Sequence, residues 1–210
     1  MAKTKKRRKA KSGAAKKKPR VKRAPKRAAR PAARRKKPAK QKSIKKSGRI
    51  AAKQPSVKTR TPATLPDIEV TTTGGQRFRL PDLHGKNVIL YFYPKDDTSG
   101  CTQEGCDVRD NFADFTMRDT VVFGVSRDSV DSHERFKLKY SFPFDLISDP
   151  NERLCRAFGV MQPKSLYGRQ YIGVERSTFV YDREGKLRRE LRGVKVPGHV
   201  AELLMELDKL

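Results

Sequence analysis

The cysteines are the residues of this chain best suited to chemistry, and Cys101 occupies the most reactive position. It follows a continuous apolar run and a short polar loop, at the point where helical spacing begins. A thiol there would face unpaired backbone N–H groups and the positive end of the helix dipole. Both favour the thiolate, which is the nucleophilic form. Thr98, three residues earlier, can present a hydroxyl to a substrate atom beside the sulfur.

Cys106 lies five residues after Cys101. The C-x4-C spacing is not the two-residue spacing of zinc sites, and no His/Cys set completes such a site. Along an intact helix, five residues place the two Cα atoms about 8.7 Å apart, beyond the roughly 7 Å that a disulfide can bridge. If the two thiols are redox partners, the first turns of the helix must unwind. The alternative is that Cys106 is a core residue at helical spacing.

The other candidate residues carry weaker signals. Cys155 lies on the apolar side of a capped helix and is predicted to be a core residue. His199 precedes the last helix and is predicted to be a capping or packing residue. The side chains predicted to be exposed to solvent are His84, His133, Asp96 and Asp97.

Hydrophobic patterning predicts the elements that must position the cysteines. Residues 87–93 (NVILYFY) form a continuous apolar run, as in a strand covered on both faces. Pro94 ends this strand, and helical spacing follows over residues 101–117. Residues 121–125 (VVFGV) predict a second buried strand.

The remaining pattern completes an α/β fold. The further predicted elements are an edge strand over 76–80 after a Gly74-Gly75 turn, a helix over 130–140 capped by Ser129 or Asp128, a helix starting at Asp149-Pro150 and ending near Gly159, a hairpin of strands 177–181 and 187–191, and an amphipathic helix over 199–210. This order predicts a mixed sheet covered on both faces. It fits a thioredoxin-like arrangement with an extra N-terminal hairpin.

Charge divides the chain into two parts. The 210 residues hold 50 Lys/Arg and 23 Asp/Glu, a net charge of +27. Residues 1–60 hold 28 of the Lys/Arg and no acid, so residues 61–210 carry 22 − 23 = −1. All 16 aromatic residues lie after residue 60. We therefore predict a disordered basic tail over 1–60 and a globular domain over 61–210.

Composition also excludes two classes of protein. No run of about 18 apolar residues exists, so a membrane-spanning helix is excluded. Three cysteines in 210 residues are too few for a disulfide-stapled secreted fold.

The tail is predicted to bind a polyanion, because it has no acid of its own to pair with. It has no aromatic residue to stack on bases, so we expect non-specific binding to DNA or RNA. In composition it resembles the Lys-, Ala- and Pro-rich tails of histone H1-like proteins. A localisation signal, a solubility tail and contact with anionic lipid are the alternatives. The predicted nucleic-acid-binding residues are Lys5, Lys6, Arg7, Arg8, Lys16, Lys17, Lys18, Arg20, Arg34, Arg35, Lys36 and Lys37.

Residues 91–110 (YFYPKDDTSGCTQEGCDVRD) resemble the active-site signature of the peroxiredoxins, most closely that of the bacterioferritin comigratory protein or PrxQ subfamily. The family pattern P-x-x-x-T/S-x-x-C maps onto Pro94, Thr98 and Cys101.

Two later segments extend this resemblance. Residues 167–181 resemble the segment that carries the family's active-site arginine, which maps to Arg176, and residues 194–204 resemble the subfamily's C-terminal stretch. The resemblance covers about residues 65–210 and leaves out the tail.

The resemblance implies a thioredoxin-like fold of the peroxiredoxin type and a thiol-dependent peroxidase acting on hydrogen peroxide and organic hydroperoxides. Cys101 would be the peroxidatic cysteine and Cys106 the resolving cysteine, joined in an intramolecular disulfide. Thr98 would bind the peroxide, Arg176 would stabilise the thiolate, and Pro94 would shield the site. A thioredoxin-like protein would be the reductant, no metal, haem or flavin would be needed, and the protein would be a monomer.

Two residues depart from the subfamily pattern. Ser99 stands where proline is usual, and Gly105 where alanine is usual. Glycine costs about 1 kcal/mol relative to alanine in a helix, so Gly105 is predicted to ease unwinding. On this reasoning Gly105→Ala would slow disulfide formation.

Together these features predict an intracellular peroxidase tethered to nucleic acid, in the nucleoid of a bacterium or the nucleus of a eukaryote. One alternative is an architectural, histone-like DNA-binding protein whose peroxidase domain is secondary. Another, a thiol–disulfide oxidoreductase, is disfavoured because the chain has no C-x-x-C motif.

Overall fold

The computed structural model describes residues 61–166 and 168–210, and the predicted basic tail with its nucleic-acid-binding residues lies outside them. The strands are β1 (Glu69–Thr72), β2 (Arg77–Arg79), β3 (Asn87–Phe92), β4 (Thr120–Ser126), β5 (Asp145–Ser148), β6 (Met161–Leu166), β7 (Arg169–Val174), β8 (Ser177–Tyr181) and β9 (Leu187–Arg192). The helices are α1 (Ser99–Asp110), α2 (Phe112–Met117), α3 (Val130–Tyr140), α4 (Arg153–Ala157) and α5 (His199–Leu207), with short 3-10 turns η1 (Thr73–Gly75) and η2 (Leu80–Leu83).

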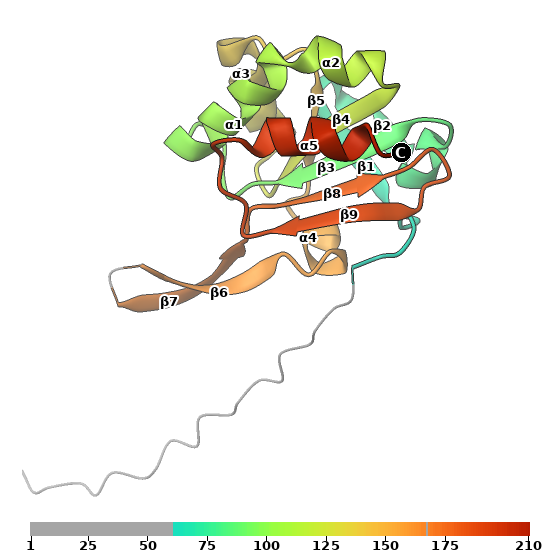
Figure 1. Cartoon of the computed structure of the whole chain (residues 1–210). Helices are drawn as coiled ribbons and strands as arrows, with labels where there is room; N and C mark the ends of the chain where they lie inside the picture. The colour runs from blue at the N-terminus through green and yellow to red at the C-terminus, as the bar shows by residue number, and fades with distance from the viewer. Residues whose placement is uncertain (1–60, 167) are drawn as a thin grey trace, which may run out of the picture. The chain divides into compact units, whose positions relative to one another are not determined.

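Seven strands form one mixed sheet in the order β2-β1-β5-β4-β3-β8-β9 (Figure 1). The pairs β3–β4 and β4–β5 are parallel, whereas β3–β8 and β8–β9 are antiparallel. This arrangement confirms the predicted thioredoxin-like α/β class, including the hairpin 177–181/187–191 and the edge position of the strand after Gly74-Gly75.

The central strand β3 separates two hydrophobic cores. Val88, Leu90 and Phe92 point into the core that contains residues of α4, while Ile89 and Tyr91 point into the opposite core. This second core contains residues of α1, α2, α3 and α5, which lie on the other face of the sheet from α4 (Figure 1). Side chains alternate between the two faces of a strand, and both faces of β3 are covered. Every residue of the unbroken apolar run is therefore buried, as predicted.

Two predicted helices differ from those observed. The helix predicted over 101–117 begins earlier, at Ser99, and is broken at Asn111 into α1 and α2. The helix predicted to start at Asp149 begins at Arg153 instead. The Asp149 carboxylate still accepts hydrogen bonds from the backbone N–H groups of Arg153 and Cys155, both at 2.8 Å, so it caps α4 from outside.

Sequence patterning did not predict β5 or the β6–β7 hairpin. Strand β5 has only four residues, too few to show a period. Strand β6 contains Pro163, which usually argues against a strand. Within residues 61–166 and 168–210, however, β6 pairs with β7 alone, so its other edge needs no backbone donor. The hairpin projects from the sheet (Figure 1) and exposes Tyr171 and Ile172.

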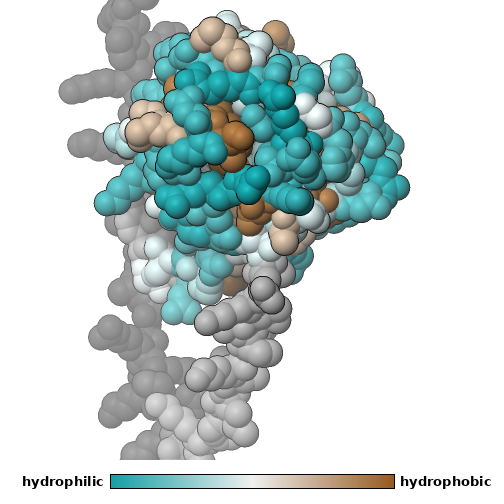
Figure 2. Space-filling model, turned by 45° about the vertical axis from the view of Figure 1, so that its right-hand side comes forward, coloured by the Kyte–Doolittle hydropathy of each residue, from teal (hydrophilic) through white to brown (hydrophobic). Residues whose placement is uncertain are grey.

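The face of the domain drawn in Figure 2 is mostly hydrophilic, with apolar residues visible in small separate places. Among the described residues, no helix is both long and apolar enough to cross a membrane.

Candidate thiol active site

The loop after β3 carries the chain to Cys101. Half-buried Pro94 begins this loop, and Thr98 takes the N-cap position of α1, where its carbonyl accepts the backbone N–H of Thr102 at 2.8 Å. Cys101 therefore lies in the first turn of α1, and it is 3% exposed. The predicted placement of this thiol at a helix start is confirmed.

Arg176 makes the most direct polar contact with the thiol. Its Nη2 donates to Cys101 Sγ at 3.3 Å, and its Nη1 forms an ion pair with the carboxylate of Glu104. Burial alone would lower the pKa of Arg176, but the charges of Glu104 and Cys101 outweigh burial and raise it. The guanidinium is thus a fixed positive charge that donates a charge-assisted hydrogen bond to the sulfur.

The backbone near Cys101 leaves room for this guanidinium. A Cβ added at Gly100 would lie 3.3 Å from Arg176 Nη2. A side chain at this position would therefore crowd the group that contacts the sulfur.

Thr98 and Pro94 belong to the loop that leads from β3 to α1. The Thr98 side chain is exposed and makes no helix-capping bond; its hydroxyl donates to the carbonyl of Lys95 at 3.1 Å. The Thr98 hydroxyl is therefore accessible to solvent next to the start of α1.

The three cysteines are free and occupy different environments. Cys106 is partly buried within the continuous helix α1, so the unwinding that a disulfide with Cys101 requires has not taken place here. Cys155 is fully buried in α4, and burial together with the nearby Asp149 carboxylate raises the pKa of its thiol. The prediction that Cys155 is a core residue is confirmed.

Glu104 is the site residue that sequence analysis missed. It is 1% exposed, and it lies three residues after Cys101, on the same face of α1. Besides its ion pair with Arg176, its Oε1 lies 3.3 Å from Nδ1 of His199. The signal available in the sequence was an acid three residues after the candidate cysteine, a spacing that places both side chains on one face of a helix. His199 itself is a buried packing residue, as predicted, while Gly198 takes the N-cap position of α5.

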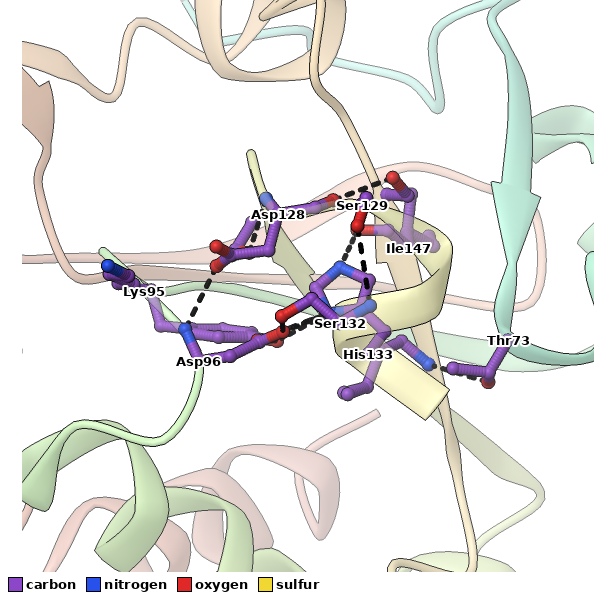
Figure 3. Close-up of polar contacts among 12 residues, drawn as sticks. Thr73, Lys95, Asp96, Asp128, Ser129, Ser132, His133 and Ile147 are labelled. Atoms are coloured by element: carbon purple, nitrogen blue, oxygen red, sulfur yellow. Dashed lines mark hydrogen bonds and ion pairs between the residues drawn. The ribbon is translucent and has the colours of Figure 1, made fainter. Parts of the chain in front are cut away.

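The predictions that Asp96 and His133 are exposed were wrong. Both are buried, and Nδ1 of His133 lies 2.9 Å from Asp96 Oδ2 while its Nε2 lies 3.2 Å from the carbonyl of Ile147 (Figure 3). The Asp96 carboxylate also accepts from Tyr93 at 2.8 Å and from Ser132 at 2.7 Å. The active-site loop is thereby fastened to α3 and β5. Asp97 and His84 are exposed, as predicted.

Hydrogen bonds in the interior explain how Asp96 can be a buried carboxylate, unlike an ordinary acid in a loop. Burial would raise the pKa of Asp96, but hydrogen bonds from His133, Ser132 and Tyr93 outweigh it and lower the pKa. Charge-assisted bonds of this kind permit a carboxylate in an otherwise costly environment.

The structure also corrects the reasoning about Gly105. A Cβ at this position would lie 2.5 Å from the ring of Phe142. Phe142 is held in a cluster with Phe136, Tyr140 and Phe144, with ring centroids 5.0 to 5.9 Å from it. Gly105 is therefore required by this close approach in the folded helix, and alanine there would create a clash instead of strengthening α1.

Comparison with known proteins identifies the family of this chain. Residues 62–190 match the AhpC/TSA family. Peroxiredoxin Bcp of Bacillus subtilis is 48% identical over 145 residues, covering 69% of this chain and 92% of the relative. A putative peroxiredoxin bcp of Coxiella burnetii is 47% identical over 142 residues, covering 68% and 94%.

Solved structures of related proteins have a similar fold. The bacterioferritin comigratory protein of Xanthomonas campestris, whose structures were described for its alkyl peroxide reduction activity, is 42% identical with a TM-score of 0.67, covering 71% of this chain and 96% of that one. Peroxidoxin BcpB of Mycobacterium tuberculosis is 30% identical with a TM-score of 0.63, covering 72% and 98%. This chain therefore belongs to the peroxiredoxins, in the Bcp or PrxQ branch of the AhpC/TSA family, and it is a thiol-dependent peroxidase.

Proposed function

We propose that Cys101 is the peroxidatic cysteine and that it reduces both hydrogen peroxide and organic hydroperoxides. The observation that carries this assignment is the contact of the Arg176 guanidinium with Cys101 Sγ at 3.3 Å, in a helix-start position. Neither Cys106 nor Cys155 has such a contact among the described residues. The alkyl peroxide reduction described for the Xanthomonas campestris relative supports organic substrates.

In the first step the Cys101 thiolate attacks one oxygen of the hydroperoxide. The S–O bond forms as the O–O bond breaks, so the sulfur is oxidised to a sulfenic acid and the alkoxide or hydroxide leaves and takes up a proton. Arg176 stabilises the negative charge on sulfur and on the departing oxygen. Thr98 offers its hydroxyl to the peroxide, and Pro94 restricts water beside the sulfur.

In the second step Cys106 is the resolving cysteine. Its thiolate attacks the sulfenic sulfur, and the disulfide forms as water is lost. Because Cys106 lies within α1, this step follows local unwinding of the helix. A thioredoxin-like dithiol then reduces the disulfide by exchange, becoming a disulfide itself. All electrons come from thiols, so the cycle needs no metal, haem or flavin, and one chain acting as a monomer holds both cysteines.

Serine variants of the three cysteines test these assignments. Cys101→Ser should abolish consumption of hydrogen peroxide measured with a thioredoxin system. Cys106→Ser should still oxidise Cys101 once but should form no intramolecular disulfide. Cys155→Ser is the matched control and should turn over at the rate of the unchanged protein. Full activity in Cys101→Ser would overturn the proposal.

We further propose that residues 1–60 tether the peroxidase to nucleic acid without sequence preference. The supporting observation is the charge division, 28 Lys/Arg and no acid in this segment against a net charge of −1 in the rest. Each phosphate that is neutralised releases counterions, so the binding should weaken steeply with salt. A peroxidase held in this way would remove peroxide close to DNA.

Deletion of residues 1–60 tests the tether. The shortened protein should lose retention on DNA and keep its peroxidase turnover. Equal DNA retention after the deletion would overturn the proposal. The rival, histone-like role predicts DNA compaction that matters to the cell even in Cys101→Ser, whereas loss of fitness in that variant favours the enzyme.

A further inference from the structure

A buried acid lies on the segment of α1 that must unwind. Glu104 stands between Cys101 and Cys106 in sequence, and it is 1% exposed. Unwinding the helix between the two cysteines must therefore move this carboxylate out of its present surroundings. The inference below rests on the proposed resolving role of Cys106.

The partners of Glu104 belong to elements other than α1. Arg176, immediately before β8, pairs with one carboxylate oxygen, and His199, the first residue of α5, faces the other. The distance from Glu104 Oε1 to His199 Nδ1 is 3.3 Å, and the His199 side chain is 2% exposed.

These facing atoms have no other partner. Within the described residues, Glu104 Oε1 and both ring nitrogens of His199 lack any hydrogen bond of good geometry. Buried polar atoms are costly unless they are paired. The carboxylate oxygen and the imidazole are consequently each other's available partners when α1 is folded.

We propose that His199 is a positioning residue for the peroxidase cycle: by facing Glu104 it holds α1 closed over Cys101 and so slows the step in which Cys106 reaches the sulfenic acid. Closing requires that the carboxylate stay between Arg176 and His199. Opening separates Glu104 from both groups at once, because neither partner lies on the helix that unwinds.

This contact would control a choice between two reactions of the Cys101 sulfenic acid. Attack by the Cys106 thiolate gives the disulfide and water. Attack by the sulfenate on a second hydroperoxide gives the sulfinic acid and an alcohol or water, with the O–O bond broken again. Slower opening gives the second reaction more time, so His199 sets the sensitivity of the enzyme to excess peroxide.

Three variants of the full-length protein test the proposal. His199→Leu keeps bulk and removes the polar atoms. His199→Asn keeps a donor near the position of Nδ1 and should restore most of the unchanged behaviour. Val200→Ala, at a buried position on the same helix, weakens the packing of α5 without removing a polar partner of Glu104, and it controls for general destabilisation.

The measurements are rapid quench, alkylation of free thiols and mass spectrometry after mixing reduced protein with increasing hydrogen peroxide. We expect His199→Leu to form the Cys101–Cys106 disulfide about tenfold faster, the effect of losing one buried contact to a charged group. We also expect it to accumulate less sulfinic acid at each peroxide concentration.

Two outcomes would overturn the proposal while leaving the assignment of Cys106 intact. One is a disulfide rate in His199→Leu equal to or below that of the unchanged protein. The other is an equal acceleration in Val200→Ala. Failure of the unchanged protein to form the Cys101–Cys106 disulfide would instead overturn the proposed resolving role, and this inference with it.

Discussion

At the scale of single residues, one guanidinium contacts both the sulfur of the proposed peroxidatic cysteine and a buried carboxylate. Arg176 contacts the Cys101 sulfur and the Glu104 carboxylate together. The carboxylate orients the arginine, and the arginine in turn holds positive charge beside the sulfur. In the proposed mechanism Arg176 acts on the reacting atoms, whereas Glu104 acts through Arg176.

Removing the guanidinium should therefore slow the first chemical step. We expect Arg176→Ala to lower the second-order rate of Cys101 oxidation by roughly 100-fold, the usual loss when one donor to developing charge is removed. Arg176→Lys should recover part of the rate, because lysine supplies charge without the two-armed geometry. Stopped-flow mixing with hydrogen peroxide measures both, and an unchanged rate in Arg176→Ala would contradict the role.

Cys155 should be chemically inert. Burial and Asp149 raise the pKa of its thiol, so the thiolate that reacts with alkylating agents is scarce at neutral pH. We expect iodoacetamide to label Cys101 in the folded protein and Cys155 only in denaturant, as peptide mass spectrometry can show. Rapid labelling of Cys155 under native conditions would contradict its placement in the core.

The helix-start position of Cys101 was predictable from the sequence pattern, and Arg176 was indicated by the resemblance to the peroxiredoxins, but their surroundings were not predictable. The sequence carries no local sign that Glu104 and His199 meet, because their contact joins α1 to α5 across 95 positions of chain. Asp96 and His133 were assigned to the surface for the same reason. Each looks like an ordinary polar residue until tertiary structure buries it against the other.

At the scale of elements, α1 carries Cys101 and also packs against an aromatic cluster. Gly105 lies under the Phe142 ring, and a Cβ there would have to displace it. We expect Gly105→Ala to lower the free energy of unfolding of the reduced protein by about 1–3 kcal/mol through overpacking. It should also speed disulfide formation, because it destabilises the folded helix.

The double variant Gly105→Ala/Phe142→Leu provides the control, since the smaller side chain leaves space for the added methyl group. Chemical denaturation should show a larger loss of unfolding free energy for Gly105→Ala alone than in the Phe142→Leu background. Thiol quenching should likewise show a larger increase in the rate of disulfide formation for Gly105→Ala alone. Slower disulfide formation with unchanged stability would contradict this account and support the simple helix-propensity argument.

The active-site loop depends on Asp96, and this dependence should be visible in acid. The folded-state pKa of Asp96 lies below its ordinary value, so its contribution is complete above about pH 4 and is lost as the pH falls through the folded-state pKa. We expect Asp96→Asn to cost about 3 kcal/mol at neutral pH by breaking the buried pair with His133.

Denaturant unfolding at a series of pH values measures this effect. The difference in unfolding free energy between the unchanged protein and Asp96→Asn should shrink as the solution becomes more acidic. Asp97→Asn, at an exposed neighbouring acid, is the matched control and should cost much less. A difference that is constant down to the lowest pH would contradict a stabilising contribution from the Asp96 carboxylate.

The predictable elements were those with a clear pattern of apolar residues or a recognisable capping residue. The buried run of β3 and the Ser129 cap of α3 were visible in the sequence, and Ser129 accepts the backbone N–H of Ser132 as expected. The break at Asn111 was not visible, because helical spacing continues across it.

At the scale of the whole molecule, charge separates a catalytic domain from a basic segment. Salt should therefore affect the two proposed activities differently. We expect affinity for DNA to fall linearly with salt on a logarithmic scale, while peroxide turnover changes little. Filter binding and a peroxidase assay across the same salt series measure both, and equal sensitivity would contradict two independent parts.

Disulfide mapping of the oxidised protein shows whether Cys101 and Cys106 form one redox couple within α1. One equivalent of hydrogen peroxide is added to the fully reduced protein, and the linked peptides are identified by mass spectrometry. We expect stoichiometric loss of peroxide and a Cys101–Cys106 link, with Cys155 still free. Peroxide loss with Cys101 linked to Cys155, or with Cys106 remaining a free thiol, would contradict it.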